Sequence, residues 1–196
     1  MTIPDDEPQS SAADGAVRTL ATRRAYTGKV INLDVDTVRF PNNSVGELEM
    51  IRHPGASAVV PLIGRADGDD PPMLLIKQYR YAADEYLYEI PAGRLDHGEG
   101  PLECARRELK EETGCSAELI QYLFTMFTTP GFTDEQIHVF MAAGLERGDT
   151  AHEPDEFLTL ETVALSRALE LIERGKIKDA KTALAILYVA TFRRPR

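Results

Sequence analysis

The stretch that decides the fold is residues 93–115, which read GRLDHGEGPLECARRELKEETGC. Its glycine is followed after five residues by Glu99, and Glu99 is followed after seven residues by Arg107, where the run RELKEETG begins. Pro101 suits the first position of a helix, and Gly114 suits the residue after a last helical turn. The spacing therefore predicts a helix between these two residues, preceded by a loop whose glycines allow tight bends.

Three glutamates lie in the second half of this predicted helix. Glu108 and Glu112 are four residues apart and stack on one helical face, and Glu111 lies beside them. Carboxylates crowded on one face repel each other unless a cation or a basic group lies among them. Their oxygens suit a hard divalent cation such as Mg2+ or Mn2+, and Arg107 could neutralise Glu99 or orient a glutamate. The alternative is a solvated helix face of mixed charges.

The complete spacing resembles the Nudix hydrolase box, G-x5-E-x7-R-E-U-x-E-E-x-G-U, in which U is an aliphatic residue. All seven fixed positions match, and only the last aliphatic position departs, as Cys115. A buried cysteine packs as a small apolar residue, so this departure is mild. The resemblance implies hydrolysis of a diphosphate that depends on Mg2+ or Mn2+, with two or three ions per site.

The resemblance also implies a role for each residue of the box. It makes Glu108 and Glu112 metal ligands, and Glu111 a lesser ligand, a positioning residue or a catalytic candidate. A backbone carbonyl just before the box glycine is a further ligand, which points to Ala92. The remaining implied members have supporting roles: the glycine itself, Gly93, and the ion pair of Glu99 with Arg107.

The flanks of the box resemble the ADP-ribose pyrophosphatase branch of this family. They are residues 77–81 (KQYRY), 89–93 (EIPAG), 53–55 (HPG) and 129–135 (TPGFTDE). Pro130, which follows the box by 15 residues, marks the same branch. Relatives that act on GDP-mannose and other nucleotide sugars share much of this pattern. The predicted reaction converts ADP-ribose and water to AMP and ribose 5-phosphate; the alternatives are another nucleotide sugar such as GDP-mannose, or a non-catalytic ADP-ribose sensor.

Four residues in these flanks are candidates for substrate binding. Arg80 is the first, because a planar guanidinium pairs two phosphate oxygens at once; its alternative is a surface salt bridge, for example to Glu85. Tyr81 could stack on a purine, or it could be an ordinary tyrosine of a sheet surface. Pro130 and Glu135 complete the set through the resemblance.

An acidic loop follows the predicted strand over residues 136–145. Relatives in the branch draw their general base from a glutamate on this loop, and by position Glu153 is the first candidate and Glu156 the second. A loop carboxylate can deprotonate a water whose pKa a divalent ion has lowered. The alternative is a solvent loop with ordinary surface acids.

The order of patterns predicts three regions and an α+β fold. Residues 1–15 hold four acids and no bases and predict a disordered tail. Residues 16–54 predict an antiparallel sheet that in this branch helps form a homodimer. The alternation of apolar residues there shifts phase between Val35 and Val38, which suggests a bulge or bend. The resemblance implies that residues 55–196 form a Nudix domain, an α/β/α sandwich with a mixed sheet.

Composition limits the partners of the chain. It has 196 residues, with 32 acidic against 22 basic side chains and a net charge of −10. This charge argues against nucleic-acid or anionic-membrane binding. We find no secretory signal pattern and no apolar stretch of the roughly 18 to 20 residues that span a bilayer. Two cysteines form no disulfide framework, so we expect a cytoplasmic protein with a small-molecule substrate.

Overall fold

The computed structural model describes residues 16–65, 68–148 and 158–192. They form two compact units. The smaller unit holds residues up to 53 together with 131–134, and the larger unit holds the rest. The predicted tail, residues 1–15, lies outside the described residues. Within the described residues, no helix is long and apolar enough to cross a membrane.

The smaller unit is a three-stranded antiparallel sheet in the order β1-β2-β3, as the sequence predicts. The expected irregularity lies in a different strand, because β2 pairs with β3 without interruption. The register shifts are instead on the other side of β2, between Thr19 and Ala21 and between Arg24 and Tyr26 of β1. The strand bounds are β1 Arg18–Thr27, β2 Asn32–Arg39 and β3 Val45–Arg52.

Buried carboxylates and arginines hold this small sheet together. Asp34 and Asp36 on the central strand are buried, and Arg52 on β3 bridges both of them. Arg24 on β1 also bonds Asp34, and its hydrogen bond holds the pKa of that carboxyl below its usual value despite burial. These charges are paired because an unpaired buried carboxylate would be costly. The burial of Asp34 and Asp36 is therefore explained by their arginine partners within the smaller unit.

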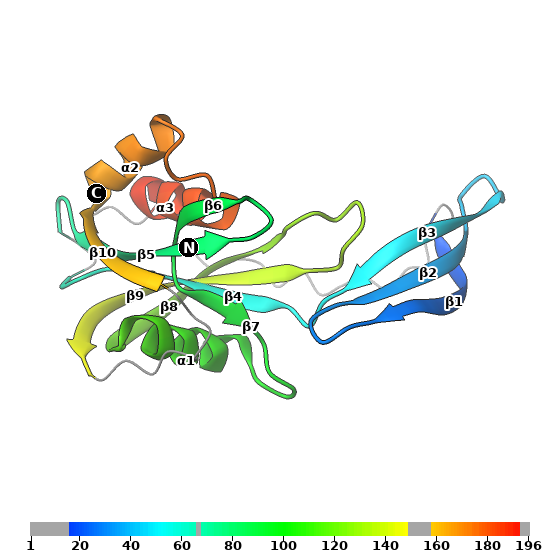
Figure 1. The fold of residues 1–196 in the computed structure, drawn as a ribbon, viewed down its shortest axis with the longest axis horizontal. Coiled ribbons are helices and arrows are strands. Elements are labelled where there is room, and N and C mark those ends of the chain that lie inside the picture. The colour runs from blue at the N-terminus through cyan, green and yellow to red at the C-terminus, as the bar shows by residue number, and fades with distance from the viewer. Residues whose placement is uncertain (1–15, 66–67, 149–157, 193–196) are drawn as a thin grey trace. The chain divides into compact units, whose positions relative to one another are not determined.

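The larger unit contains two sheets and all three helices (Figure 1). One sheet has the order β7-β4-β9-β8 and is mixed, because β4 runs parallel to β9 while the other pairs are antiparallel. The second sheet, β10-β5-β6, is antiparallel. The elements are β4 Ala56–Pro61, β5 Pro72–Arg80, β6 Glu85–Glu89, β7 Ala92–Arg94, α1 Pro101–Thr113, β8 Cys115–Phe127, β9 Gln136–Arg147, β10 Leu158–Ala164, α2 Leu165–Glu173 and α3 Ala180–Phe192.

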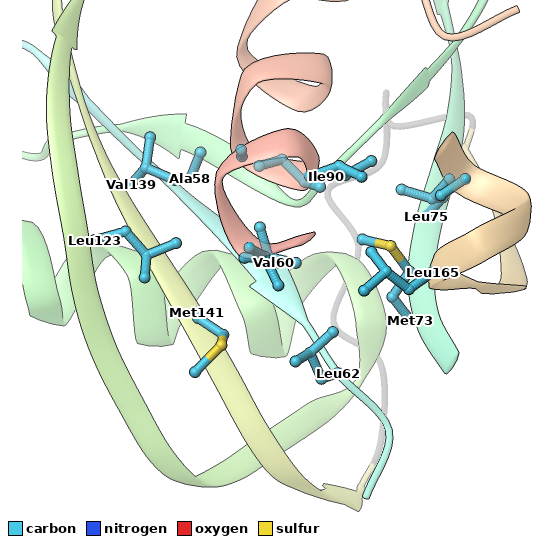
Figure 2. Packing of buried hydrophobic residues seen from close by; sticks show 14 of the residues in the cluster. Ala58, Val60, Leu62, Met73, Leu75, Ile90, Leu123, Val139, Met141 and Leu165 are labelled. Atoms are coloured by element: carbon cyan, nitrogen blue, oxygen red, sulfur yellow. The ribbon is translucent and has the colours of Figure 1, made fainter. Parts of the chain in front are cut away.

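The central strand β4 is buried on both faces, which produces the sandwich. Ala58 and Val60 point into the main core, which includes residues of α2 and α3 (Figure 2). Val59, on the opposite face, packs against Ala105 and Leu109 of α1. One helix thus covers one face of the mixed sheet, and the second sheet with two helices covers the other (Figure 1). The expected α/β/α arrangement is confirmed.

The local signals in the box place α1 at the predicted residues. The helix begins at Pro101 and ends at Thr113, and Gly114 takes the left-handed conformation with φ 69°. Strand β7 was not predicted, because three residues are too few to show a period. It pairs antiparallel with β4 and brings the box glycine to the edge of the mixed sheet, beside α1.

Candidate active site

The second half of α1 carries two buried carboxylates. Glu108 and Glu112 are only 7% and 3% exposed. Leu109, which follows Glu108, packs against the mixed sheet, so this side of the helix lies close to the sheet. The backbone N–H of Ala92 donates to Glu112 Oε2 at 2.9 Å. The helix and the short strand β7 are therefore joined at the residues that the sequence marks as metal ligands.

Gly93 is a glycine for a steric reason. A Cβ atom at this position would lie 1.8 Å from Glu108 Oε1 and 2.1 Å from the carboxyl carbon of the same residue. A Cβ at that distance would force the Glu108 carboxylate or the strand to move, whereas glycine accommodates both where they are. The supporting role expected for Gly93 is to make room for the Glu108 carboxylate.

Arg107 connects the carboxylates of the box. Its Nε and Nη2 donate to the two oxygens of Glu99, both at 2.8 Å, and its Nη1 donates to Glu108 at 2.5 Å and Glu111 at 3.0 Å. The bidentate bond lowers the pKa of Glu99 to about 2, and the carboxylates in turn raise the pKa of Arg107. Glu111 is the more exposed of the glutamates on this helix that Arg107 bonds.

The donor set of this cluster fits a divalent cation. Buried carboxylate oxygens on one helix face are hard ligands, and the Glu108 carboxylate lies directly against Gly93 of β7, next to the Ala92 carbonyl that the sequence marks as a ligand. Across the described part of the chain, no group of three or more His, Cys, Asp or Glu side chains has the geometry of a metal site. A cation bound by Glu108, Glu112 and the backbone carbonyl of Ala92 would therefore need further ligands that these residues do not supply.

Arg80, at the end of β5, bonds the carboxylate of Glu89 and not that of Glu85, the alternative partner suggested by the sequence. Its Nε and Nη2 donate to Oε1 and Oε2 of Glu89 at 2.6 and 2.8 Å, while Glu85 bonds Lys178 at 2.8 and 2.9 Å. The predicted alternative of a surface salt bridge between Arg80 and Glu85 is therefore wrong. The bond to Glu89 raises the pKa of Arg80, and the charge of Glu112 contributes to the same shift. Arg80 thus lies within the electrostatic reach of the α1 cluster.

The remaining predicted substrate-binding residues lie in two turns, one between β5 and β6 and one between β8 and β9. Tyr81 is at the tip of the β5–β6 hairpin and is 91% exposed. Pro130 is exposed in the turn between β8 and β9. Glu135 accepts a hydrogen bond from Thr128 Oγ1 at 2.8 Å, which helps close the same turn. Glu153 and Glu156, the candidates for general base, lie outside the described residues.

The sequence interpretation missed a buried ion pair behind Arg80. Glu89 is 1% exposed and also accepts a hydrogen bond from Lys181 Nζ, at 2.5 Å. Burial alone would raise the pKa of Glu89, but Arg80 and Lys181 outweigh it and lower the pKa. Residues 85–89 read EYLYE and show no apolar run that would mark Glu89 as buried, so no local signal pointed to this ion pair.

A family comparison identifies this arrangement. The model of the NUDIX domain matches residues 53–184 of the chain. The chain belongs to the Nudix family. The matched range contains the box and most of the larger unit, so family and fold agree on the same residues.

Relatives of this Nudix chain cover nearly its whole length. An ADP-ribose pyrophosphatase from Bacillus subtilis (strain 168) is 40% identical over 174 residues, which are 88% of this chain and 91% of the relative. A methanol dehydrogenase activator from Bacillus methanolicus is 38% identical with the same coverage. A solved structure of an ADP compounds hydrolase superposes with a TM-score of 0.77 at 22% identity, over 92% of this chain and 95% of that one. This last likeness supports the fold.

Proposed function

We propose that this chain hydrolyses the diphosphate bond of ADP-ribose, giving AMP and ribose 5-phosphate, in a reaction that depends on a divalent metal. Family membership and the ADP-ribose pyrophosphatase among its relatives support a Nudix pyrophosphatase. The observation that carries the proposal is the pair of buried carboxylates on α1, with Arg80 within their electrostatic reach. One side of this site suits a cation and the other suits a phosphate.

Glu108 and Glu112, with the carbonyl of Ala92, would hold Mg2+ or Mn2+, two or three ions per site. When bound, such ions lower the pKa of water and neutralise charge on the reacting diphosphate. Arg107 keeps Glu108 and Glu111 oriented, while Glu99 fixes the plane of Arg107 through two hydrogen bonds.

Arg80 would bind a phosphate of the substrate, because a guanidinium matches two phosphate oxygens. For the general base we propose Glu153, with Glu156 as the second candidate, on the strength of the family resemblance. Substituting each with glutamine ranks the two: the base is the residue whose loss lowers kcat far more at unchanged KM. Equal and small effects would exclude both.

The test of the main proposal is a substrate panel. Purified chain is incubated with ADP-ribose, GDP-mannose and other nucleoside diphosphate derivatives plus Mg2+ or Mn2+, with and without a chelator. We expect AMP from ADP-ribose and none when the chelator is present. Cleavage of GDP-mannose alone would move the activity to that alternative substrate, and release of AMP with the chelator present would contradict metal dependence.

A second candidate is a binding protein that regulates another enzyme. The relative from Bacillus methanolicus is named as an activator of methanol dehydrogenase, which favours keeping this candidate. It predicts that the chain binds ADP-ribose in calorimetry yet releases no AMP in the panel. Turnover of ADP-ribose would leave regulation as an additional role only.

We also propose a cytoplasmic homodimer formed through the smaller unit. All ten residues of β1 are exposed within the single chain, including Leu20 and Tyr26. The two buried cysteines are free thiols, which suits a reducing compartment. Sedimentation of the full chain tests the dimer, and replacing Leu20 with glutamate should shift it toward the monomer. A monomeric wild type would contradict the proposal.

A further inference from the structure

The half-buried side chain of Arg80 is the most exposed member of a network that centres on Glu89. Glu89 at the end of β6 has a side chain only 2% exposed, and Lys181 in the first turn of α3 is 12% exposed, whereas the side chain of Arg80 is 42% exposed. Glu89 Oε1 accepts from Arg80 at 2.6 Å, and Oε2 accepts from both Arg80 and Lys181, at 2.8 and 2.5 Å. The two strands of one hairpin and a helix 92 positions farther along the chain thus meet at one carboxylate.

Lys181 is held in place from the opposite side as well. Asp179 Oδ2 accepts from Lys181 at 3.0 Å, and the same oxygen accepts from the backbone N–H and the hydroxyl of Thr182. The Thr182 hydroxyl oxygen in turn accepts from the N–H of Ile90, which follows Glu89. The start of α3 is therefore locked to the end of β6, and the ammonium group stays on Glu89.

The charges explain why two cations share this carboxylate. With Arg80 alone, Glu89 would cancel the positive charge that a diphosphate must meet. Lys181 supplies a second cation to the same carboxylate and also bonds Asp179, so the four side chains together are formally neutral. Without Lys181 they would carry one negative charge beside Arg80, which would weaken the attraction of Arg80 for a phosphate. A guanidinium has five N–H donors, and the fork to Glu89 uses only two of its nitrogens, so donors remain for phosphate.

Resting on the proposed function, we propose that Glu89 and Lys181 are positioning residues for diphosphate binding. Glu89 fixes the plane of the Arg80 guanidinium, and Lys181 keeps the cluster around Glu89 from becoming negatively charged. The C-terminal helix thereby contributes to substrate affinity through a residue that need not touch the substrate. The two residues act differently: one on orientation and the other on charge.

The test compares Lys181→Met with a matched control, Lys178→Met. Lys178 is a nearby lysine that pairs with Glu85, so its loss removes the same charge from the same region without affecting Glu89. We expect Lys181→Met to raise KM for ADP-ribose about tenfold with kcat within about twofold of wild type. Lys178→Met should leave both constants unchanged, and Lys181→Arg should restore KM.

Glu89→Gln tests the other half of the proposal. It removes the negative charge but also the fork that orients Arg80, so we expect kcat to fall about tenfold without a rise in KM. A purely structural role would lower the folded fraction, and hence apparent kcat, in both variants while leaving KM unchanged. Circular dichroism gives the folded fraction to which each kcat is normalised. A rise in KM for Glu89→Gln as large as for Lys181→Met would contradict the division of roles.

The outcomes separate this proposal from the proposed function. If wild type cleaves ADP-ribose but Lys181→Met keeps its KM, or Lys178→Met raises KM equally, the positioning role is overturned. If Lys181→Met does not fold, Lys181→Gln takes its place with the same expectation. If wild type does not cleave ADP-ribose, the proposed function fails, and calorimetry with inorganic pyrophosphate decides the positioning role: weaker binding by Lys181→Met supports it, and equal binding overturns it.

Discussion

Two charge networks in the larger unit are built on the same bond but differ in net charge. In each, an arginine makes a two-pronged hydrogen bond to a glutamate: Arg107 to Glu99 in the box, and Arg80 to Glu89 between β5 and β6. In the box, however, the one guanidinium hydrogen-bonds three carboxylates. In the other network, two cations share the carboxylate of Glu89, and one of them also bonds Asp179.

The difference shows how one site can hold ions of both signs. The box network has more negative groups than positive ones, so it attracts a divalent cation, and its arginine orients the carboxylates. The second network pairs two cations with two carboxylates, because Asp179 also bonds Lys181, so it is formally neutral and does not repel the anionic diphosphate. An acidic protein with a net charge of −10 can therefore bind an anionic substrate, because local charge outweighs the total.

The largest effect should come from Glu112→Gln, which tests the negative side of the comparison. The glutamine carbonyl can still accept the Ala92 N–H, so the fold should remain, but one anionic ligand is lost. Losing several kcal/mol of charge stabilisation corresponds to a fall in kcat of at least about 100-fold. Steady-state rates with ADP-ribose at saturating Mg2+ measure it. Glu103→Gln, an exposed glutamate on the same helix, is the control, and an equal loss there would contradict the assignment.

The two networks also differ in how far the sequence predicts them. The box network lies within 23 consecutive residues, and proline, glycine and glutamate spacing define α1 from Pro101 to Thr113. Such signals act over one or two helical turns. Glu89 and Lys181 are 92 positions apart, and they meet only because β6 and α3 pack in the folded chain. No local period encodes that contact, so the sequence predicted Arg80 as a phosphate ligand but not its partners.

Arg107→Lys should sharpen the comparison by changing the metal side alone. Lysine has no planar fork, so it cannot hold both oxygens of Glu99 and also reach Glu108 and Glu111. Loss of an orienting group of this kind lowers metal affinity or activity about 10- to 100-fold. Mn2+ titration followed by electron paramagnetic resonance measures the affinity, with the exposed neighbour Arg106→Lys as control. A rise in KM for ADP-ribose at saturating metal would show that the two networks are not separate.

Gly93→Ala tests whether the carboxylate of Glu108 needs the space that the glycine leaves. The added Cβ would lie 1.8 Å from Glu108 Oε1, so the side chain or the strand must move. Overpacking of this kind costs about 1–3 kcal/mol in the free energy of unfolding. Chemical denaturation measures it, with Gly131→Ala as control, because a Cβ there meets no atom within 4 Å. A Gly93→Ala protein as stable as wild type would show that the cluster adapts readily.

The smallest effect concerns pH and distinguishes Glu99 as a charged partner from Glu99 as a packing residue. Its pKa is about 2 in the folded chain, against an ordinary 4.5, because Arg107 bonds the ionised form. A lowered pKa stabilises the fold above the ordinary value, and this contribution is lost as pH falls from about 4.5 toward 2. Glu99→Gln should therefore be less stable than wild type at pH 7, and the difference should shrink below pH 4.5. Thermal unfolding at pH 7, 4 and 3 tests this, and a difference independent of pH would mean that shape alone holds Glu99 against Arg107.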